Sequence, residues 1–269
     1  MRDGGLLERL AQDLQRQGGP VEIRSLAAGL LMAPDSELAQ RVLEAILEGD
    51  PRFVVREGSV SLRPTDSVFL GSPLRAVEFA VLDFETNGLE EDRAIEVGVV
   101  CMRDGKVTDS FSSLLDPGTP VAPFVTRMTG IASEHLAGQP GFAEVWPRLQ
   151  DYLSGRILVA HNLPFDRRIL RREVGLLGGD RRIGHQALCT LRLARRLFPG
   201  EDSKSLDALA ERFSLTFTAR HRALGDAAVT GALLYRLIDE AARHAPMETW
   251  NDLAAFVGTT RPRRRRRKA

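Results

Sequence analysis

The stretch AVLDFETNG (80–88) decides the fold, because it joins a strand-like apolar run to two acids and a turn. Its first three residues are apolar, as in a strand that is buried on both faces. Asp83 and Glu85 are two residues apart, so their side chains leave the same face of that strand. Asn87 and Gly88 indicate a turn, which places the two acids at a strand end, where open α/β sheets bind ligands. Buried unpaired acids are costly, so we predict a functional pair.

Two further motifs carry acids in similar places. In HNLPFD (161–166), Asp166 follows a strand-like run and opens a predicted helix, whose positive end favours an acid. In HRALGDAA (221–228), His221 precedes another predicted helix and Asp226 lies in its early turns. Several carboxylates at one point repel one another unless divalent cations neutralise them. Four acids from three motifs therefore predict a metal site.

The composition is typical of a folded globular chain, with 43% hydrophobic and 27% charged residues among 269. No apolar run approaches the roughly 20 residues that span a bilayer. The first residues lack a signal-peptide core, so we expect neither export nor a membrane partner. Cys101 and Cys189 each lie in an apolar stretch. We interpret them as buried thiols of a reducing compartment.

Charge is unevenly distributed along the chain. The net charge is +1, yet RPRRRRRKA (261–269) carries seven positive charges and no acid, which leaves 30 basic against 36 acidic residues elsewhere. An acidic body with a polycationic tail suits a metal site that acts on a polyanion. A solvated tail without a specific role is an equally good interpretation.

The pattern of elements divides the chain into four parts. Residues 1–64 predict three helices and a β-hairpin, a winged-helix-like module whose acidic third helix favours protein contact over DNA reading. Residues 65–75 are a linker, and 244–269 form a C-terminal segment with the basic tail. Residues 76–243 predict three antiparallel strands followed by alternating helices and strands. This order predicts an α/β domain with a mixed sheet flanked by helices.

The three motifs, read as DFETNG (83–88), HNLPFD and HRALGDA (221–227), resemble the DEDDh family of 3′–5′ exonucleases. This ribonuclease H-like family includes the proofreading epsilon subunit of bacterial DNA polymerase III. The resemblance spans roughly 76–243, and supporting segments are TRMTGI (126–131), ALCTLRLARRLFP (187–199) and SLDALAERF (205–213). Asn87 stands where many relatives have a second threonine.

The resemblance implies a two-metal hydrolase that releases nucleoside 5′-monophosphates. Two Mg²⁺ or Mn²⁺ ions are expected, with His221 as the general base. The implied ligands are the four acids, Asp83, Glu85, Asp166 and Asp226. Thr86, His161 and Asn162 are the predicted substrate-binding residues, although strand-end packing explains the last two equally well.

The expected substrate is a single-stranded or frayed DNA 3′ end, in proofreading or repair, with a DNA polymerase subunit as an expected partner. The motif wording is closer to the polymerase-associated branch than to oligoribonuclease, which typically has a methionine after the first glutamate. The resemblance also implies a cytoplasmic protein. Two alternatives stay open: a 3′–5′ exoribonuclease, and a nucleic-acid-binding regulatory protein that uses the winged helix and basic tail. The intact catalytic set argues against the second.

Overall fold

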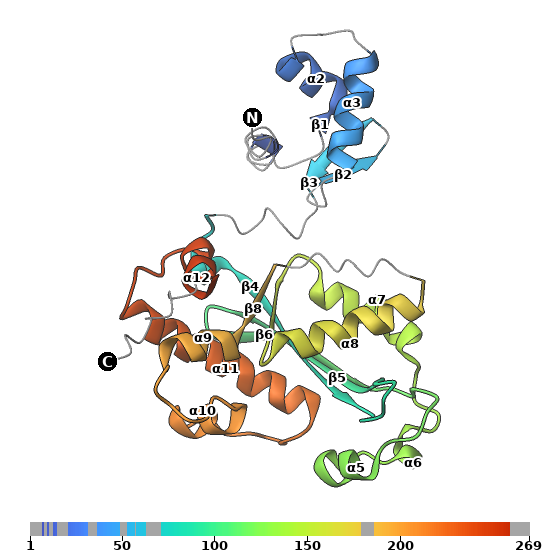
Figure 1. Ribbon diagram of the computed structural model, residues 1–269, viewed down its shortest axis with the longest axis vertical. Coiled ribbons are helices and arrows are strands. Elements are labelled where there is room, and N and C mark those ends of the chain that lie inside the picture. Colours follow the sequence, from blue (N-terminus) through green and yellow to red (C-terminus); the bar gives the residue numbers. More distant parts are fainter. Residues whose placement is uncertain are drawn as a thin grey trace, which may run out of the picture. The chain divides into compact units, whose positions relative to one another are not determined.

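The computed structural model divides the chain into two compact units, Met1–Leu70 and Gly71–Ala269, which are described separately (Figure 1). The described residues are 7, 10, 13, 14, 21–31, 37–48, 53–56, 58–62, 71–178 and 186–258. The arginine tail and most of the predicted linker and first helix lie outside them.

The N-terminal unit packs two helices on a small antiparallel sheet. The helices are α2 (Ile23–Leu31) and α3 (Glu37–Glu48), and the strand order is β1 (Val21–Glu22), β3 (Ser59–Leu62), β2 (Phe53–Arg56). Gly58 takes the left-handed φ of 71° in the turn before β3, a conformation that favours glycine. The sequence predicted only the strands of the hairpin, and β1 adds a third by pairing Val21 with Val60. The winged-helix interpretation stays a prediction.

Helix α3 turns an apolar face outward. Leu38, Val42 and Ile46 share one side of the helix, and their exposed fractions are 71%, 46% and 42%. Leu43 and Leu47, on the other side, are buried in the core of this unit. Helix α3 therefore carries apolar residues on two sides, and the core uses the side that holds Leu43 and Leu47.

The second unit is built on a mixed five-stranded sheet, which confirms the predicted α/β fold. The strand order is β6-β5-β4-β7-β8; β5 pairs antiparallel with β4 and β6, whereas β4–β7 and β7–β8 are parallel. The strands are β4 (Glu78–Thr86), β5 (Ala94–Arg103), β6 (Lys106–Leu114), β7 (Ile157–Ala160) and β8 (Ala187–Cys189). The helices are η1 (Leu74–Ala76), α5 (Pro123–Thr129), α6 (Ser133–Leu136), α7 (Phe142–Leu153), α8 (Leu163–Leu176), α9 (Thr190–Leu197), α10 (Leu206–Arg212), α11 (Ala223–Ala242) and α12 (Trp250–Gly258).

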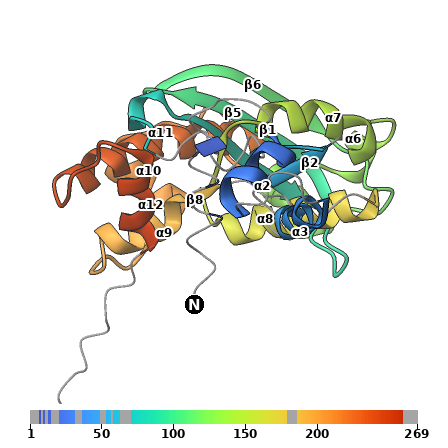
Figure 2. The same cartoon turned by 90° about the horizontal axis from the view of Figure 1, so that it is seen from above.

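The two faces of β4 meet different helices. Ala80, Leu82 and Phe84 belong to a core shared with α7 and α8. The alternate residues face α11, as the edge-on contact of Phe79 with Tyr235 shows. Figure 2 shows the C-terminal helices grouped apart from α7 and α8. Because strand side chains alternate, Asp83 and Glu85 lie on the α11 side of the sheet.

Helix α8 begins earlier than the sequence pattern predicted. Its first residue is Leu163, three positions before Asp166. Pro164 fits the first turn because its missing N–H needs no partner there. Asp166 therefore lies within the first turn and not ahead of it. In the described part of the chain, no helix is both long and apolar enough to cross a membrane.

Candidate active site

Acids from three elements meet at the end of the central strand. Asp83 and Glu85 come from β4, and Asp226 from the first turn of α11. One ligand oxygen from each of these three carboxylates lies within 4.8 Å of the others. Asp166, in the first turn of α8, accepts a hydrogen bond from the backbone N–H of Phe84 at 3.2 Å. The structure thus places the fourth predicted acid against the strand segment that carries the first two.

The carboxylates hold their protons more tightly than free acids do. Burial raises the pKa of Asp83 well above its usual value, and the three other acids raise it further. Burial also raises the pKa of Asp166 to about 8, although backbone N–H donors oppose the rise and Glu85 adds to it. The pKa of Glu85 rises to about 7, first through burial and then through the charge of Asp226. A cluster of this kind ionises fully only when a cation compensates it.

The donor set fits a divalent cation. Asp226 is buried, and its Oδ1 has no hydrogen-bond partner among the described residues. A buried oxygen without a partner is costly unless another group satisfies it. Carboxylate oxygens are the ligands that Mg²⁺ and Mn²⁺ prefer. Asp83, Glu85 and Asp226 would hold such an ion, and the contact of Asp166 with β4 places it beside them.

Arg220 is a cation of the site that the sequence analysis missed. Its Nη1 forms an ion pair with Asp226 Oδ2, while its Nε and Nη2 contact Asp207 at 2.6 and 2.8 Å. Burial raises the pKa of Asp226, and the Arg220 guanidinium limits that rise. Arg220 therefore links the acid cluster to α10, which carries Asp207.

A buried glutamate positions the start of α11. Glu96 on β5 accepts hydrogen bonds from Arg222 Nη2 at 2.8 Å and from the Ala223 backbone N–H at 3.0 Å. Gly98, two residues later, lies against the same turn, where an added Cβ would be 2.3 Å from the backbone nitrogen of Leu224. These contacts place the first turn of α11, and with it Asp226, over the end of the sheet.

His221 lies in the turn just before α11. It is half-buried and has a left-handed φ of 59°, which is uncommon for a residue with a side chain. Its charged form lowers the pKa of Asp226 and of Asp207, so it lies within electrostatic reach of the acids. None of the three described cavities has His221 in its lining. Its role as general base stays a prediction.

The three predicted substrate-binding residues lie in different places. Thr86, at the end of β4, lines a cavity beside Asp83 and Glu85. His161 lines a second cavity that also reaches Asp83. Asn162 is exposed, takes a left-handed φ of 75° as the N-cap of α8, and lines a third cavity away from the acids.

Both ring nitrogens of His161 already have protein partners. Nδ1 lies 2.9 Å from Thr190 Oγ1, and Nε2 lies 3.0 Å from the Lys204 carbonyl oxygen. Burial lowers the pKa of His161 and so favours the neutral ring. The carbonyl accepts only, so we assign the hydrogen to Nε2. The Thr190 hydroxyl lies within hydrogen-bond distance of both Nδ1 and the Ala160 carbonyl oxygen. This arrangement gives His161 a positioning role for the chain around Lys204, and its substrate contact stays a prediction.

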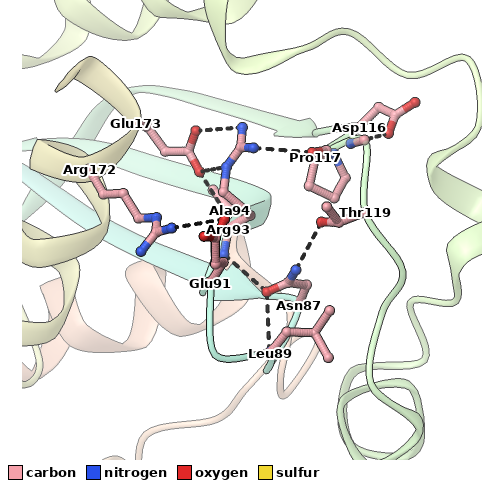
Figure 3. Close-up of polar contacts among 11 residues, drawn as sticks. Asn87, Leu89, Glu91, Arg93, Ala94, Asp116, Pro117, Thr119, Arg172 and Glu173 are labelled. Carbon is pink, nitrogen blue, oxygen red and sulfur yellow. Dashed lines mark hydrogen bonds and ion pairs between the residues drawn. The ribbon is translucent and has the colours of Figure 1, made fainter. Parts of the chain in front are cut away.

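A polar network holds the turn that follows the first acids (Figure 3). Asn87 is fully buried; its Oδ1 accepts from the Arg93 backbone N–H at 3.0 Å, and its Nδ2 donates to Thr119 Oγ1 at 3.1 Å. Glu173 on α8 accepts from Arg93 Nε and from the Ala94 N–H, both at 2.9 Å. Asn87 therefore organises the loop from β4 to β5 and does not present its side chain to the acids.

Two open cavities flank the acid cluster. One, of about 640 Å³, is lined by Asp83 and Asp226 together with Arg195, Lys204 and Arg220. The other, of about 420 Å³, contains Asp83, Glu85, Thr86 and exposed apolar side chains. These apolar side chains belong to Leu89, Phe124 and Met128, with exposed fractions of 40%, 52% and 47%. Met128 lies in TRMTGI, a segment to which the sequence analysis assigned no function.

A mixed sheet with acids at the end of its central strand and at two helix starts defines a class, that of the ribonuclease H-like exonucleases. Sequence comparison agrees. The chain belongs to the exonuclease family, also called RNase_T, whose sequence model matches residues 80–234. Its second unit is an exonuclease domain homologous to the DEDDh 3′–5′ exonucleases, which confirms the predicted family and enzyme class.

Several similar curated proteins are named as a PolC-type DNA polymerase III or as its epsilon subunit. The chain is 37% identical over 193 residues to the PolC-type DNA polymerase III of Lacticaseibacillus paracasei, matching 69% of this chain but only 13% of that protein. It is 31% identical over 182 residues to the epsilon subunit of DNA polymerase III of Aquifex aeolicus, covering 67% of this chain and 87% of the subunit. The chain thus spans a small part of the PolC-type relatives and most of the epsilon subunit.

Solved structures agree with the fold. Exonuclease X in complex with 5′-overhanging duplex DNA is 28% identical, with a TM-score of 0.53 over 67% of this chain and 99% of that one. The nuclease domain of 3′hExo, a DEDDh family member bound to rAMP, is 16% identical, with a TM-score of 0.55 over 63% of this chain and 95% of that domain. The second likeness shows the fold alone.

Proposed function

We propose that the chain removes nucleoside 5′-monophosphates from DNA 3′ ends, in proofreading or repair, with two Mg²⁺ or Mn²⁺ ions as cofactors. The observation that carries the proposal is the group of three carboxylates within 4.8 Å of one another, with an unpartnered oxygen on Asp226. Open cavities on either side provide access for a polymer end.

Each group of residues has its own role in the proposed hydrolysis. When bound, divalent ions would lower the pKa of a water molecule and offset the charge that builds on the scissile phosphate. The four acids would hold those ions. His221 accepts the proton of the attacking water, because a neutral imidazole is a competent base near pH 7. Thr86 donates a hydrogen bond near the terminal nucleotide, and Phe124 offers a surface on which its base stacks.

DNA is favoured over RNA by the relatives whose identity is high enough to carry an argument. Those relatives are named as DNA polymerase III components, and the exonuclease X structure contains DNA. A DNA polymerase subunit is accordingly the proposed partner. Exoribonuclease activity is the second candidate, because metal-bound carboxylates act on the phosphodiester group, which DNA and RNA share.

The N-terminal unit is proposed to contact protein and not to read DNA. Helix α3 carries one cation, Arg41, against three acids, which would repel phosphate. Its exposed side holds Leu38 and Val42, and exposed apolar side chains gathered on one face suit a protein contact.

The test is digestion of 5′-labelled single-stranded DNA and RNA of equal sequence by the purified chain, in Mg²⁺ and in EDTA. We expect stepwise shortening of DNA from the 3′ end in Mg²⁺ only, and its loss in Asp226→Asn. The matched control Asp239→Asn, an exposed aspartate of the same helix, should stay active. Equal activity of Asp226→Asn, or shortening in EDTA, would refute the proposal. Faster digestion of RNA would favour the second candidate.

A further inference from the structure

Helix α8 carries four arginines that divide between two faces. Arg168 and Arg172 reach toward the loop between β4 and β5, where Arg168 pairs with Asp92 at 2.9 Å and Arg172 with Glu91 at 3.5 Å. Arg167 and Arg171 are also four residues apart and share a face. Each precedes its counterpart in the other pair by one residue, so this pair points to a different side of the helix. The first pair connects α8 to the loop between β4 and β5, and the second pair faces another side of the helix.

The second pair faces a groove between α8 and α9. This cavity, of about 410 Å³, is lined by Arg167 and Arg171 from α8 and by Arg192 and Arg195 from α9, and none of its lining residues is acidic. In the described part of the chain, no ion pair joins Arg171, Arg192 or Arg195 to an acid. Burial lowers the pKa of Arg167, and the charge of Arg171 lowers it further. Among the described residues, Arg171, Arg192 and Arg195 thus give the groove positive charge that no acid compensates.

The groove continues from the active site. Leu191 and Arg195 line both this cavity and the one that contains Asp83 and Asp226. Along α8, Arg167 directly follows Asp166, and Arg171 lies about 7.5 Å further along the helix axis than Asp166. A nucleic-acid strand whose 3′ end lies at the acids would therefore reach the arginine groove within a short distance. Asn162, at the N-terminus of α8, adds an exposed polar side chain to the same lining.

We propose that this arginine groove holds phosphates of the nucleic-acid strand on the 5′ side of the scissile bond. The inference rests on the proposed function, because it takes the acid cluster as the place where the 3′ end is cut. Arginine suits the task, since its planar guanidinium donates two parallel hydrogen bonds to phosphate oxygens. The groove contacts the phosphodiester backbone, which DNA and RNA share. It therefore makes the enzyme prefer strands of several nucleotides over fragments too short to reach the groove.

The first test measures binding without catalysis. A labelled single strand of twelve nucleotides is titrated with the full chain in EDTA at several salt concentrations, using fluorescence anisotropy, with DNA and RNA in separate arms. The double variant Arg171→Ala/Arg192→Ala should bind more weakly, and its slope of log affinity against log salt should fall by about 1.4, or about 0.7 for each lost phosphate contact. Both arginines are exposed, so the fold should tolerate the change, and thermal melting verifies this.

A matched control removes the same charge elsewhere. Arg236→Ala/Arg243→Ala changes two exposed arginines, one within α11 and one at its C-cap, which line none of the described cavities. This control should retain the wild-type slope. The variant Arg171→Lys/Arg192→Lys should regain most of the slope, because lysine restores the charge. An equal loss of slope in the α11 control, or competition by poly-glutamate as strong as that by the oligonucleotide, would overturn the proposal.

The second test measures chain-length preference in Mg²⁺. In the Arg171→Ala/Arg192→Ala variant, kcat/KM on the twelve-nucleotide strand should fall at least about tenfold. On a dinucleotide without a 5′ phosphate, which has no phosphate on the 5′ side of the scissile bond, kcat/KM should stay unchanged. If both substrates lose activity equally and the salt slope is wild-type, the groove inference fails while the exonuclease assignment stands. If the wild-type chain cuts neither substrate, the proposed function fails, and the anisotropy slope still tests whether the groove binds phosphate.

Discussion

Without metal, the second unit should lose stability as the pH rises through the range in which the acid cluster ionises. An acid whose pKa is higher in the folded than in the unfolded protein binds more protons when folded, so its contribution to stability is full at low pH and disappears as the pH rises. For Glu85, whose pKa rises from 4.5 to about 7, that contribution is present below pH 4.5 and lost by about pH 7. The pKa of Asp166, raised to about 8, has the same effect: its contribution to stability is lost as the pH rises to about 8.

The magnitude follows from the pKa of Glu85. A rise from 4.5 to about 7 corresponds to roughly 3 kcal/mol, at about 1.4 kcal/mol per pH unit. Because coupled carboxylates titrate together, we take this figure as the scale for the whole cluster. For a unit of this size, roughly 3 kcal/mol corresponds to a fall in Tm of about 6 to 12 °C. Mg²⁺ at a hundredfold excess over its Kd should raise the free energy of unfolding by about 2.7 kcal/mol at pH 8. The increase should be much smaller at pH 5, where protons occupy the carboxylates.

The assay is thermal melting followed by circular dichroism from pH 5 to pH 8, in EDTA and in Mg²⁺. Glu85→Gln removes the titrating group and should flatten the EDTA profile, whereas Asp239→Asn, on the exposed side of α11, should leave it unchanged. The difference between wild type and Glu85→Gln isolates the cluster from the histidines that titrate in the same range. Parallel EDTA profiles for these two proteins, or equal stabilisation by Mg²⁺ at both ends of the range, would refute the reasoning.

Three further substitutions test the parts that surround the acids. Glu96→Gln should lower the Tm of the second unit by about 4 to 8 °C, or about 2 kcal/mol for the charged contacts with Arg222. The control Glu240→Gln, in an ion pair with a largely exposed arginine, should cost less than about 1 kcal/mol; equal losses in the two variants would contradict the positioning role of Glu96. His221→Ala should lower kcat by about a hundredfold or more with little change in Mg²⁺ affinity measured by calorimetry, and a wild-type kcat would exclude it as the base. Phe124→Ala should raise KM for DNA about tenfold through lost base stacking, and an unchanged KM would remove this side chain from the substrate site.

The sequence predicted the acids of the site because their placement is local. Asp83 and Glu85 share a face for the simple reason that strand side chains alternate, and Asp166 and Asp226 each lie in the first turn of a helix. Strand alternation and helix starts depend only on neighbouring residues, so they can be predicted without knowing what the segment packs against. The same rules explain the one local error at the site, since Pro164 allowed α8 to begin before Asp166.

The side chains that the sequence did not reveal have partners that are distant along the chain. Arg220, in the turn before α11, contacts Asp207, thirteen residues away on α10. No sequence pattern in either segment predicts this pair. The ring nitrogens of His161 contact Thr190 and Lys204, which are 29 and 43 residues away, so no local pattern reveals these contacts. Asn87 looked like a substituted threonine next to the acids, yet it is buried and holds the loop from β4 to β5.

The apolar pattern of α3 shows why periodicity alone does not identify a core. Leu38, Val42 and Ile46 recur at helical spacing, as buried residues do, but the helix has a second apolar side. Leu43 and Leu47 on that side meet the sheet and α2, so they are buried and the first set is exposed. A helix that is apolar on two sides exposes apolar surface to solvent unless a partner covers the side that does not face the core. The side that a sequence pattern singles out most clearly can therefore be the one reserved for a partner, and this argument underlies the proposed protein-contact role of the N-terminal unit.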